Sequence, residues 1–310
     1  MYRIYAFIFL FSFILPSISV VADNTDIHEN AGTRAMTFLK IGIGAKAMGM
    51  GESQVAATDD LYASYWNPAG LVKLEKPQLA LMHNEWFAEI NHEFIGFAFP
   101  FGNNNTVGAS ANFLSFGELQ GRDQDGNETE IFRPYDLAVI LSYARGFGEA
   151  LAVGINAKYL QEQIADESGN GYAFDFGGLY TFSEIPLSFG VNAQHVGPRV
   201  KYIEDSFPLP FVLRLGAAYR LWKDAVILAL DFIRPTDNDN SVGVGIGYTL
   251  ANVLQLRTGY KYKFGGNDLG AISGLAGGFG LTLKRFQIDY ALVPFGNLGL
   301  THRFSLIASF

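Results

Sequence analysis

The five histidines are the residues best able to do acid–base or metal chemistry in this chain, which has no cysteine. Their spacing contains no H-E-x-x-H metal motif, and the sequence contains no G-x-S-x-G nucleophile motif. Two of them fall on the apolar phase of strand-like segments near the segment ends, where we expect histidines at a membrane interface. An acid–base role would require a positioned partner, and none is identifiable. The sequence therefore predicts no catalytic residue and no cofactor; the histidines are His28, His83, His92, His195 and His302, of which His195 and His302 are the two on strands.

Two acidic segments, residues 123–130 and 236–240, are the other candidates for a ligand site. Clustered oxygen ligands suit calcium, but Gly126 stands at the wrong offset for an EF-hand loop. We therefore expect solvated external loops and no metal site, with calcium as the alternative. The glycine series Gly243-x-Gly245-x-Gly247 lacks the G-x-G-x-x-G pattern of a nucleotide site and predicts a smooth strand surface instead.

The first 22 residues have the pattern of a secretory signal. Arg3 is followed by an apolar run that Pro16 ends, and small residues precede an expected cleavage point near Ala22. Removing Arg3 changes the net charge from −8 to −9, which disfavours nucleic acid as a partner. Because 49% of the residues are hydrophobic and only 17% are charged, the exported chain is too apolar to be disordered. It is expected to be a soluble β protein or an outer-membrane barrel.

From residue 75 to the end, apolar residues recur at every second position. The run Leu151-Val153-Ile155-Ala157-Tyr159 is an example, and its other face carries Ala152, Gly154, Asn156 and Lys158. This alternation is the signature of strands, and their lengths suit tilted strands that cross a bilayer. We expect roughly fourteen of them, at residues 76–83, 91–101, 105–118, 134–146, 150–164, 171–182, 187–197, 209–221, 225–235, 240–250, 253–264, 273–283, 285–294 and 299–310. The third alternates poorly near its end, which predicts a bulge there and, as the less favoured alternative, a lateral opening.

Loop lengths and the charged strand face favour an outer-membrane barrel over a soluble β protein. Connections after even-numbered strands are short and most of those after odd-numbered strands are longer, as in outer-membrane barrels with short periplasmic turns. The smaller, glycine-rich strand face carries the charges. Since a lysine or arginine facing lipid costs about 2–4 kcal/mol, this face is expected to line the lumen. The predicted fold is all-β, an antiparallel transmembrane barrel whose lumen holds Lys158, Arg214, Arg220, Arg257, Lys261, Lys263, Arg303, Asp175, Asp231 and Asp289.

Residues 23–74 interrupt this pattern and predict a short helical hatch inside the barrel formed by residues 75–310. Asp59 or Asp60 can cap one helix, and Asn67 can cap a second turn that begins at Pro68. We expect hatch carboxylates (Glu52, Asp59 and Asp60) to pair with lumen cations, because unpaired buried charge is costly. The candidate cations are Arg214, Arg220 and Arg257, although capping alone would also explain the two aspartates.

The opening of the hatch resembles that of the PorV/PorQ family, within the FadL-like outer-membrane barrel superfamily. The resemblance lies in Phe38 to Gly42, in Ala45 to Gly51, in the Asp59-Asp60 pair and in Trp66-Asn67-Pro68-Ala69-Gly70. It implies an outer-membrane protein with no enzymatic role that is an accessory of type IX protein secretion or of surface attachment. The alternative is a FadL-like channel for hydrophobic small molecules. The resemblance also implies outer-membrane lipid and secretion-system proteins or exported cargo as partners.

The last strand ends in Phe310, on the same face as Phe304 and Leu306. A terminal phenylalanine on an alternating strand resembles the signal that the outer-membrane insertion machinery reads. We therefore expect that machinery to be a further partner.

The two candidate functions predict different barrels. An accessory of secretion should have a closed barrel and an apolar or aromatic patch on its external loops, expected around Val200 to Pro210. A solute channel should instead have a gap in its wall.

Overall fold

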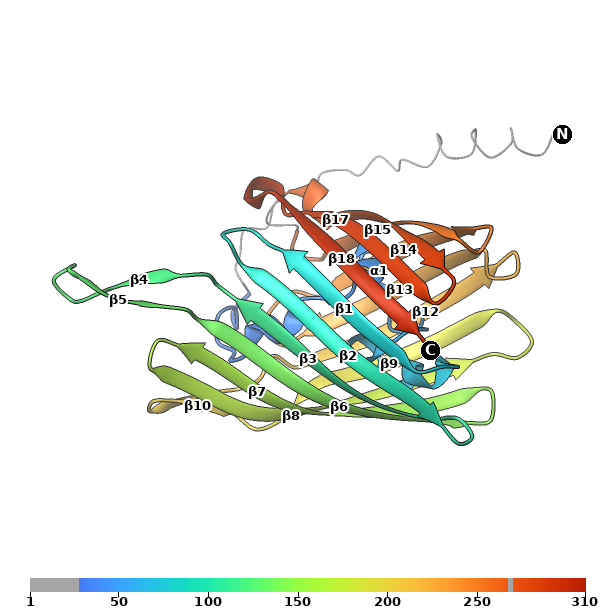
Figure 1. Cartoon of the computed structure of the whole chain (residues 1–310), viewed down its shortest axis with the longest axis horizontal. Helices are drawn as coiled ribbons and strands as arrows, with labels where there is room; N and C mark the ends of the chain where they lie inside the picture. Colours follow the sequence, from blue (N-terminus) through green and yellow to red (C-terminus); the bar gives the residue numbers. More distant parts are fainter. Residues whose placement is uncertain (1–27, 267–269) are drawn as a thin grey trace.

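The computed structural model describes residues 28–266 and 270–310. The predicted signal segment and its cleavage point near Ala22 lie outside these residues. Within them, fourteen strands form a closed antiparallel barrel, as predicted. The strands are steeply inclined in side view (Figure 1). They are β1 (Gln78–Glu85), β2 (Asn91–Phe101), β3 (Asn105–Ser115), β6 (Tyr135–Phe147), β7 (Leu151–Ile164), β8 (Glu167–Thr181), β9 (Leu187–Val196), β12 (Val212–Leu221), β13 (Val226–Pro235), β14 (Ser241–Leu250), β15 (Leu254–Lys263), β16 (Leu275–Leu283), β17 (Phe286–Pro294) and β18 (Leu300–Ser309).

Two pairings close the ring. The first joins the ends of the barrel sequence, with β1 running antiparallel to β18 from Gln78↔Ser309 to Glu85↔His302. The second joins β8 to β9 from Phe174↔Val196 to Thr181↔Ser188, with a register shift next to Phe174. Every other strand pairs with its neighbour in the barrel sequence.

Loop lengths differ between the two ends of the barrel. At one end the connections are short, and Ala251 and Asn252 between β14 and β15 both have positive φ, as tight hairpin turns require. At the other end two loops contain hairpins, β4 (Leu119–Arg122) with β5 (Glu128–Phe132), and β10 (Val200–Tyr202) with β11 (Asp205–Phe207). The β4–β5 hairpin projects well beyond the barrel (Figure 1). This difference assigns the short-turn end to the periplasm.

Apolar and charged side chains lie on the two faces of the barrel wall as predicted. Large apolar side chains such as Ile95, Leu141 and Leu230 are exposed on the outside. The predicted lumen charges Lys158, Arg214, Arg257 and Arg303 are buried inside, together with Asp175, Asp231 and Asp289. No helix in the described part of the chain is long and apolar enough to cross a membrane.

The third strand differs from the expectation. β3 ends at Ser115 and pairs with β2 and β6 over its whole length without a register shift. The poorly alternating residues 116–118 belong to the following loop, so neither the expected bulge nor a gap is present at this strand.

Residues 28–74, here called the hatch, fill the lumen. Their regular elements are short: η1 (Thr37–Lys40), α1 (Ala45–Gly49), α2 (Ala63–Trp66) and η2 (Pro68–Lys73). The hatch starts among the long loops, where Ala35 N donates to Pro208 O (3.1 Å) and Lys40 contacts Asp237 (2.5 Å). It crosses the lumen and passes into β1 at the short-turn end.

Candidate functional site: the hatch and its seat in the barrel

Asn67 holds the centre of the hatch together. Its side chain accepts a hydrogen bond from Ala69 N (3.2 Å), so it caps η2, and Pro68 is the first residue of that helix, as predicted. Its amide also donates to Val55 O (2.8 Å) and to Gly178 O in β8 (3.0 Å). Asn67 is fully buried, and one side chain thereby joins two hatch segments to the barrel wall.

We expect Asn67→Ala to lower the free energy of unfolding by about 2–4 kcal/mol, since it removes a cap and leaves buried backbone carbonyls without a donor. Chemical unfolding followed by tryptophan fluorescence measures the change. Asn30→Ala, at the start of the hatch, is the control, because the hydrogen bonds of Asn30 within the described residues all go to its sequence neighbours. A shift of the same size for both variants would show that the Asn67 contacts contribute nothing specific.

Trp66 and the two residues before it connect helix α2 to the barrel wall. The indole N–H of Trp66 donates to Ile43 O (2.7 Å), and the Arg214 guanidinium lies over its ring at 4.9 Å. Three consecutive carbonyls at the end of α2 each accept an amide from the wall. The donors are Asn156 to Ser64 O (2.7 Å), Gln194 to Tyr65 O (2.7 Å) and Asn192 to Trp66 O (2.8 Å). These otherwise unpaired helix carbonyls are thus satisfied by the barrel.

The three arginines that were expected to pair with hatch carboxylates behave differently. Arg214 contacts Glu52 of the hatch (3.5 Å), which also binds Lys261 (2.8 Å). Arg257 instead pairs with Asp289 of β17 (2.5 Å), so its expected pairing with a hatch carboxylate is wrong. Arg220 makes no ion pair among the described residues.

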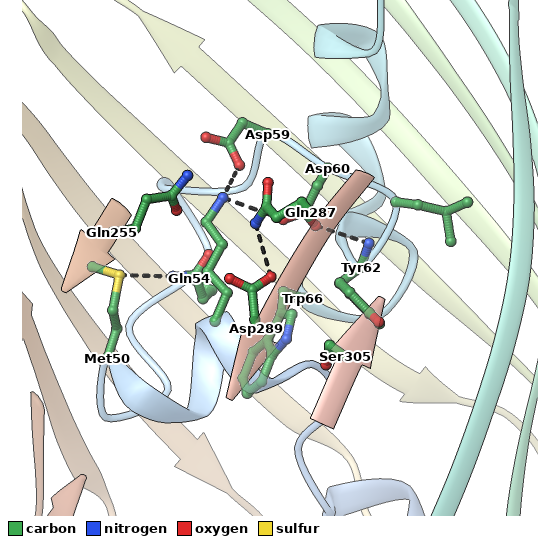
Figure 2. A network of polar contacts seen from close by, with 12 residues as sticks. Met50, Gln54, Asp59, Asp60, Tyr62, Trp66, Gln255, Gln287, Asp289 and Ser305 are labelled. Atoms are coloured by element: carbon green, nitrogen blue, oxygen red, sulfur yellow. Dashed lines mark hydrogen bonds and ion pairs between the residues drawn. The ribbon is translucent and has the colours of Figure 1, made fainter. Parts of the chain in front are cut away.

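Lys46, which sequence reasoning missed, is the partner of Asp59 and Asp60. Asp60 also accepts a hydrogen bond from Tyr62 N (3.0 Å) and so caps the turn before α2. A cation of the hatch itself therefore satisfies both aspartates, and the barrel arginines are left for Glu52 and Asp289. The aspartates lie at the short-turn end beside Gln255, Gln287 and Asp289 (Figure 2).

Glu52 makes the hatch seat dependent on pH. Burial alone would raise the pKa of this hatch carboxyl, but Lys261 and Arg214 together lower the pKa below its ordinary value. Its stabilising contribution is therefore complete above the unfolded-state pKa of about 4.3 and is lost as the pH falls through the lowered folded pKa. We expect proteolysis of the hatch to rise on acidification below about pH 4, and to do so less steeply in Glu52→Gln. Parallel pH profiles for the two proteins would contradict this.

Asp231 is a second wall contact that the sequence placed in the lumen without a partner. One carboxylate oxygen accepts the backbone N–H groups of both Gln54 and Val55 (2.8 Å each). This resembles a capping interaction, made here between β13 and a loop of the hatch. Its only sequence signal is an aspartate on the inward phase of a strand.

His195 was predicted to lie on the lipid-facing side of its strand, and this prediction is wrong. The register shift next to Phe174 and a φ of 62° at His195 turn its side chain into the lumen, where it is 2% exposed. There Lys158 Nζ lies 3.1 Å from His195 Nδ1 and 2.6 Å from Asp175 Oδ2. Asp175 also accepts hydrogen bonds from Asn156 Nδ2 (2.7 Å) and from the backbone N–H of His195 (2.9 Å). His302 does lie on the outward phase and hydrogen-bonds to Tyr290 (2.8 Å).

Inward-facing glycines form the remaining part of the seat. A Cβ on Gly259 would overlap backbone atoms of Met50 and Gly51, and one on Gly154 would overlap the backbone of Pro68 and Ala69. The series Gly243-x-Gly245 belongs to this surface, because a Cβ there would overlap Gly51 O or Met50 O. The smooth face predicted from the sequence is thus the surface on which the hatch backbone rests.

Two further expectations concern the ends and the loops. Phe310 is exposed just beyond β18, and its N–H donates to Pro77 O (3.0 Å). Among residues 28–266 and 270–310, no group of three or more histidine or acidic side chains is arranged to hold a metal ion. In the acidic loop at 123–130, Asp123 instead binds the amide and backbone of Asn127.

The fold is similar to that of known hydrocarbon transporters. A monoaromatic hydrocarbon channel (TodX, a deletion mutant) has a TM-score of 0.65 at 13% identity, over 87% of this chain and 99% of that one. The toluene transporter TbuX of Ralstonia pickettii has a TM-score of 0.61 at 16% identity, over 87% and 98%. A FadL homologue of Pseudomonas aeruginosa has a TM-score of 0.56 at 10% identity, over 86% and 98%. At these identities the likeness concerns the fold alone.

Comparison with curated protein sequences gave no match. The family comparison is specific, because the model of the type IX secretion system protein PorV matches residues 24–250, which include the whole described hatch and ten of the barrel strands. Together with the closed barrel, this match places the protein in the outer membrane. The chain belongs to the PorV family.

Proposed function

We propose that this outer-membrane barrel is a non-enzymatic accessory of type IX protein secretion or of surface attachment of exported proteins. The observation that carries the proposal is the seat of the hatch, which is bound to the wall from several sides. Glu52, Trp66 and Asn67 contact strands β8, β9, β12 and β15. Moving the hatch would break several buried polar contacts at once, each costing about 1–3 kcal/mol if left unmade. A barrel that is plugged in this way is better suited to binding other proteins than to letting solutes pass through its lumen.

The wall supports the same conclusion. A FadL-like channel for hydrophobic solutes was the alternative, and it requires a lateral gap. β3 instead pairs in unbroken register with both neighbours. The solute-channel function therefore rests on the shared fold, whereas the accessory function rests on the family and on the seated hatch.

Partners of this kind would bind at the long-loop end. The expected patch around Val200 to Pro210 is smaller than predicted, because Val200 and Leu209 are buried against the hatch. Ile203 at the tip of the β10–β11 hairpin is 70% exposed and Phe207 is 39% exposed. We propose these two side chains as the apolar contact for a secretion-system protein or an exported cargo. We also propose that the insertion machinery reads Phe310 at the exposed end of β18.

Deletion of the protein tests the proposal. We expect proteins to be lost from the secreted and surface fractions, measured by quantitative proteomics, while uptake of fatty acids and of toluene stays unchanged. Complementation with an Ile203→Asp and Phe207→Asp double variant should restore less secretion than the wild-type chain at equal barrel abundance. Unchanged secretion with reduced uptake would favour the solute channel instead.

A further inference from the structure

Lys73 carries a buried ammonium group with no partner. It is the last residue of η2, where the hatch leaves the lumen at the short-turn end. Its Nζ is inaccessible to solvent and has no hydrogen-bond partner among the described residues. An unpaired buried charge is costly, so such a group points to a ligand that is not part of the chain.

Lys73 lies on the wall of a cavity of about 280 Å³. The cavity opens between the short turns that follow β2, β6 and β8, which form the periplasmic end of the barrel. Its apolar side chains are Val72, Leu179, Ala150 and Ala152, while the side chain of Leu151 is exposed on the outer face of the barrel. The polar Asn104 and Thr181 also line it, and they already hydrogen-bond to Gly148 O and to Ser188. One cation without a partner, next to apolar side chains, suits a single anionic group that is attached to an apolar body.

The surrounding charges favour an anion. Burial lowers the pKa of Lys73 to about 8; the cations Arg220 and Lys46 act in the same direction, and the carboxylate of Asp59 acts against them. No hydrogen bond or ion pair joins the Arg220 guanidinium to a described side chain, so two cations at this end of the lumen lack a partner. An anion bound beside Lys73 would lower the free-energy cost of keeping both Lys73 and Arg220 charged.

Glu149 is the one acidic side chain on the same cavity wall. It is exposed and forms no ion pair with Lys73. An incoming anion would be repelled by this carboxylate, and a rotation of Glu149 toward Lys73 would compete with the ligand. Glu149 therefore provides a variant with the opposite expected effect.

We propose that this cavity binds a carboxylate on a short apolar stem, with the stem against Val72 and Leu179 and with the Lys73 side chain turned so that its Nζ meets the carboxylate. A free phosphate fits less well, because compact anions are usually held by several N–H donors. The carboxylate is supplied either by a small free acid or by the C-terminal residue of a peptide. This site is independent of the proposed role in secretion.

Ligand-observed NMR on the purified barrel tests the site. The probes are isovalerate as the free acid, acetyl-alanyl-valine as the peptide terminus, and isovaleramide as the neutral control. We expect at least one of the two carboxylates to bind and the amide to bind roughly tenfold more weakly or not at all, because a charged hydrogen bond is lost. The better of the two carboxylates identifies the source of the ligand.

Three variants complete the experiment. Lys73→Met should weaken carboxylate binding roughly tenfold, and Glu149→Gln should tighten it about threefold. Lys76→Met, an exposed lysine three residues further on, should leave it unchanged. Heat-modifiable gel migration shows whether each variant has a folded barrel. Equal binding of isovalerate and its amide, unchanged binding in folded Lys73→Met, or displacement of isovalerate by equimolar inorganic phosphate would each overturn the proposal.

Discussion

Replacing Gly259 with valine is expected to displace the hatch and to open an ion-conducting path through the barrel. Gly259 faces inward on β15, and its Cα lies against the backbone of Met50 and Gly51. A Cβ at this position would overlap backbone atoms, which cannot turn away as a side chain can. We expect the free energy of unfolding to fall by about 3 kcal/mol, at the upper end of the cost of overpacking.

Single-channel conductance in planar bilayers is the primary measurement, with protease sensitivity of the hatch as the second. Gly277→Val is a matched control, because Gly277 lies on the adjacent strand β16 and an added Cβ would have no neighbour closer than 3.9 Å. Gly154→Val tests the same idea on the opposite wall, where the overlap would be with Pro68 and Ala69. If Gly259→Val conducts no more than Gly277→Val and its hatch is equally resistant to protease, close packing against Gly259 does not hold the hatch in place.

The barrel itself could be predicted because its signal is local and repeated. Alternation such as that from Leu151 to Tyr159 identifies a strand and both of its faces at once, since the side-chain period of a strand is two. An error of a few residues at a strand end leaves the faces unchanged. Strand number and the lumen charges follow from counting such segments. The Asn67-Pro68 cap was predictable for the same reason, because a cap depends on adjacent residues.

The pairing inside the lumen could not be predicted, because it depends on where two distant segments meet. Arg214 and Arg257 look equivalent in sequence, as each is a lone arginine on an inward phase. Only the path of the hatch brings Glu52 to Arg214 and leaves Asp289 for Arg257. His195 shows a second limit. One residue of register shift reverses the face of a side chain, and no local pattern announces that shift.

The seated hatch also bears on how a family with a transporter-like fold can serve a different purpose. The same ring of strands encloses a lumen in the hydrocarbon channels, but fold similarity at 10–16% identity does not carry function. In this chain the hatch occupies the lumen and is hydrogen-bonded to the wall from several sides. What remains available to partners is therefore the outside of the barrel, its loops and its two ends.

Removing the carboxylate of Asp175 is expected to have the largest effect on stability of any single ion-pair change in the barrel wall. Asp175 is fully buried, and it binds Lys158 (2.6 Å), Asn156 and the backbone N–H of His195. Asp175→Ala leaves the Lys158 ammonium buried without a counter-ion, which costs about 3–5 kcal/mol. The hatch should loosen as well, because Asn156 also holds Ser64 O.

A double variant separates the charge from the geometry. In Lys158→Met with Asp175→Ala no unpaired charge remains, so we expect the double variant to be more stable than Asp175→Ala alone by about 2 kcal/mol. The exposed pair Arg122–Glu128 in the β4–β5 hairpin is the control, and Glu128→Ala there should change the free energy of unfolding by less than about 1 kcal/mol. Guanidinium unfolding of the barrel in lipid vesicles measures all three. A double variant less stable than Asp175→Ala would mean that the Lys158 stem contributes more to the stability of the wall than its unpaired charge costs.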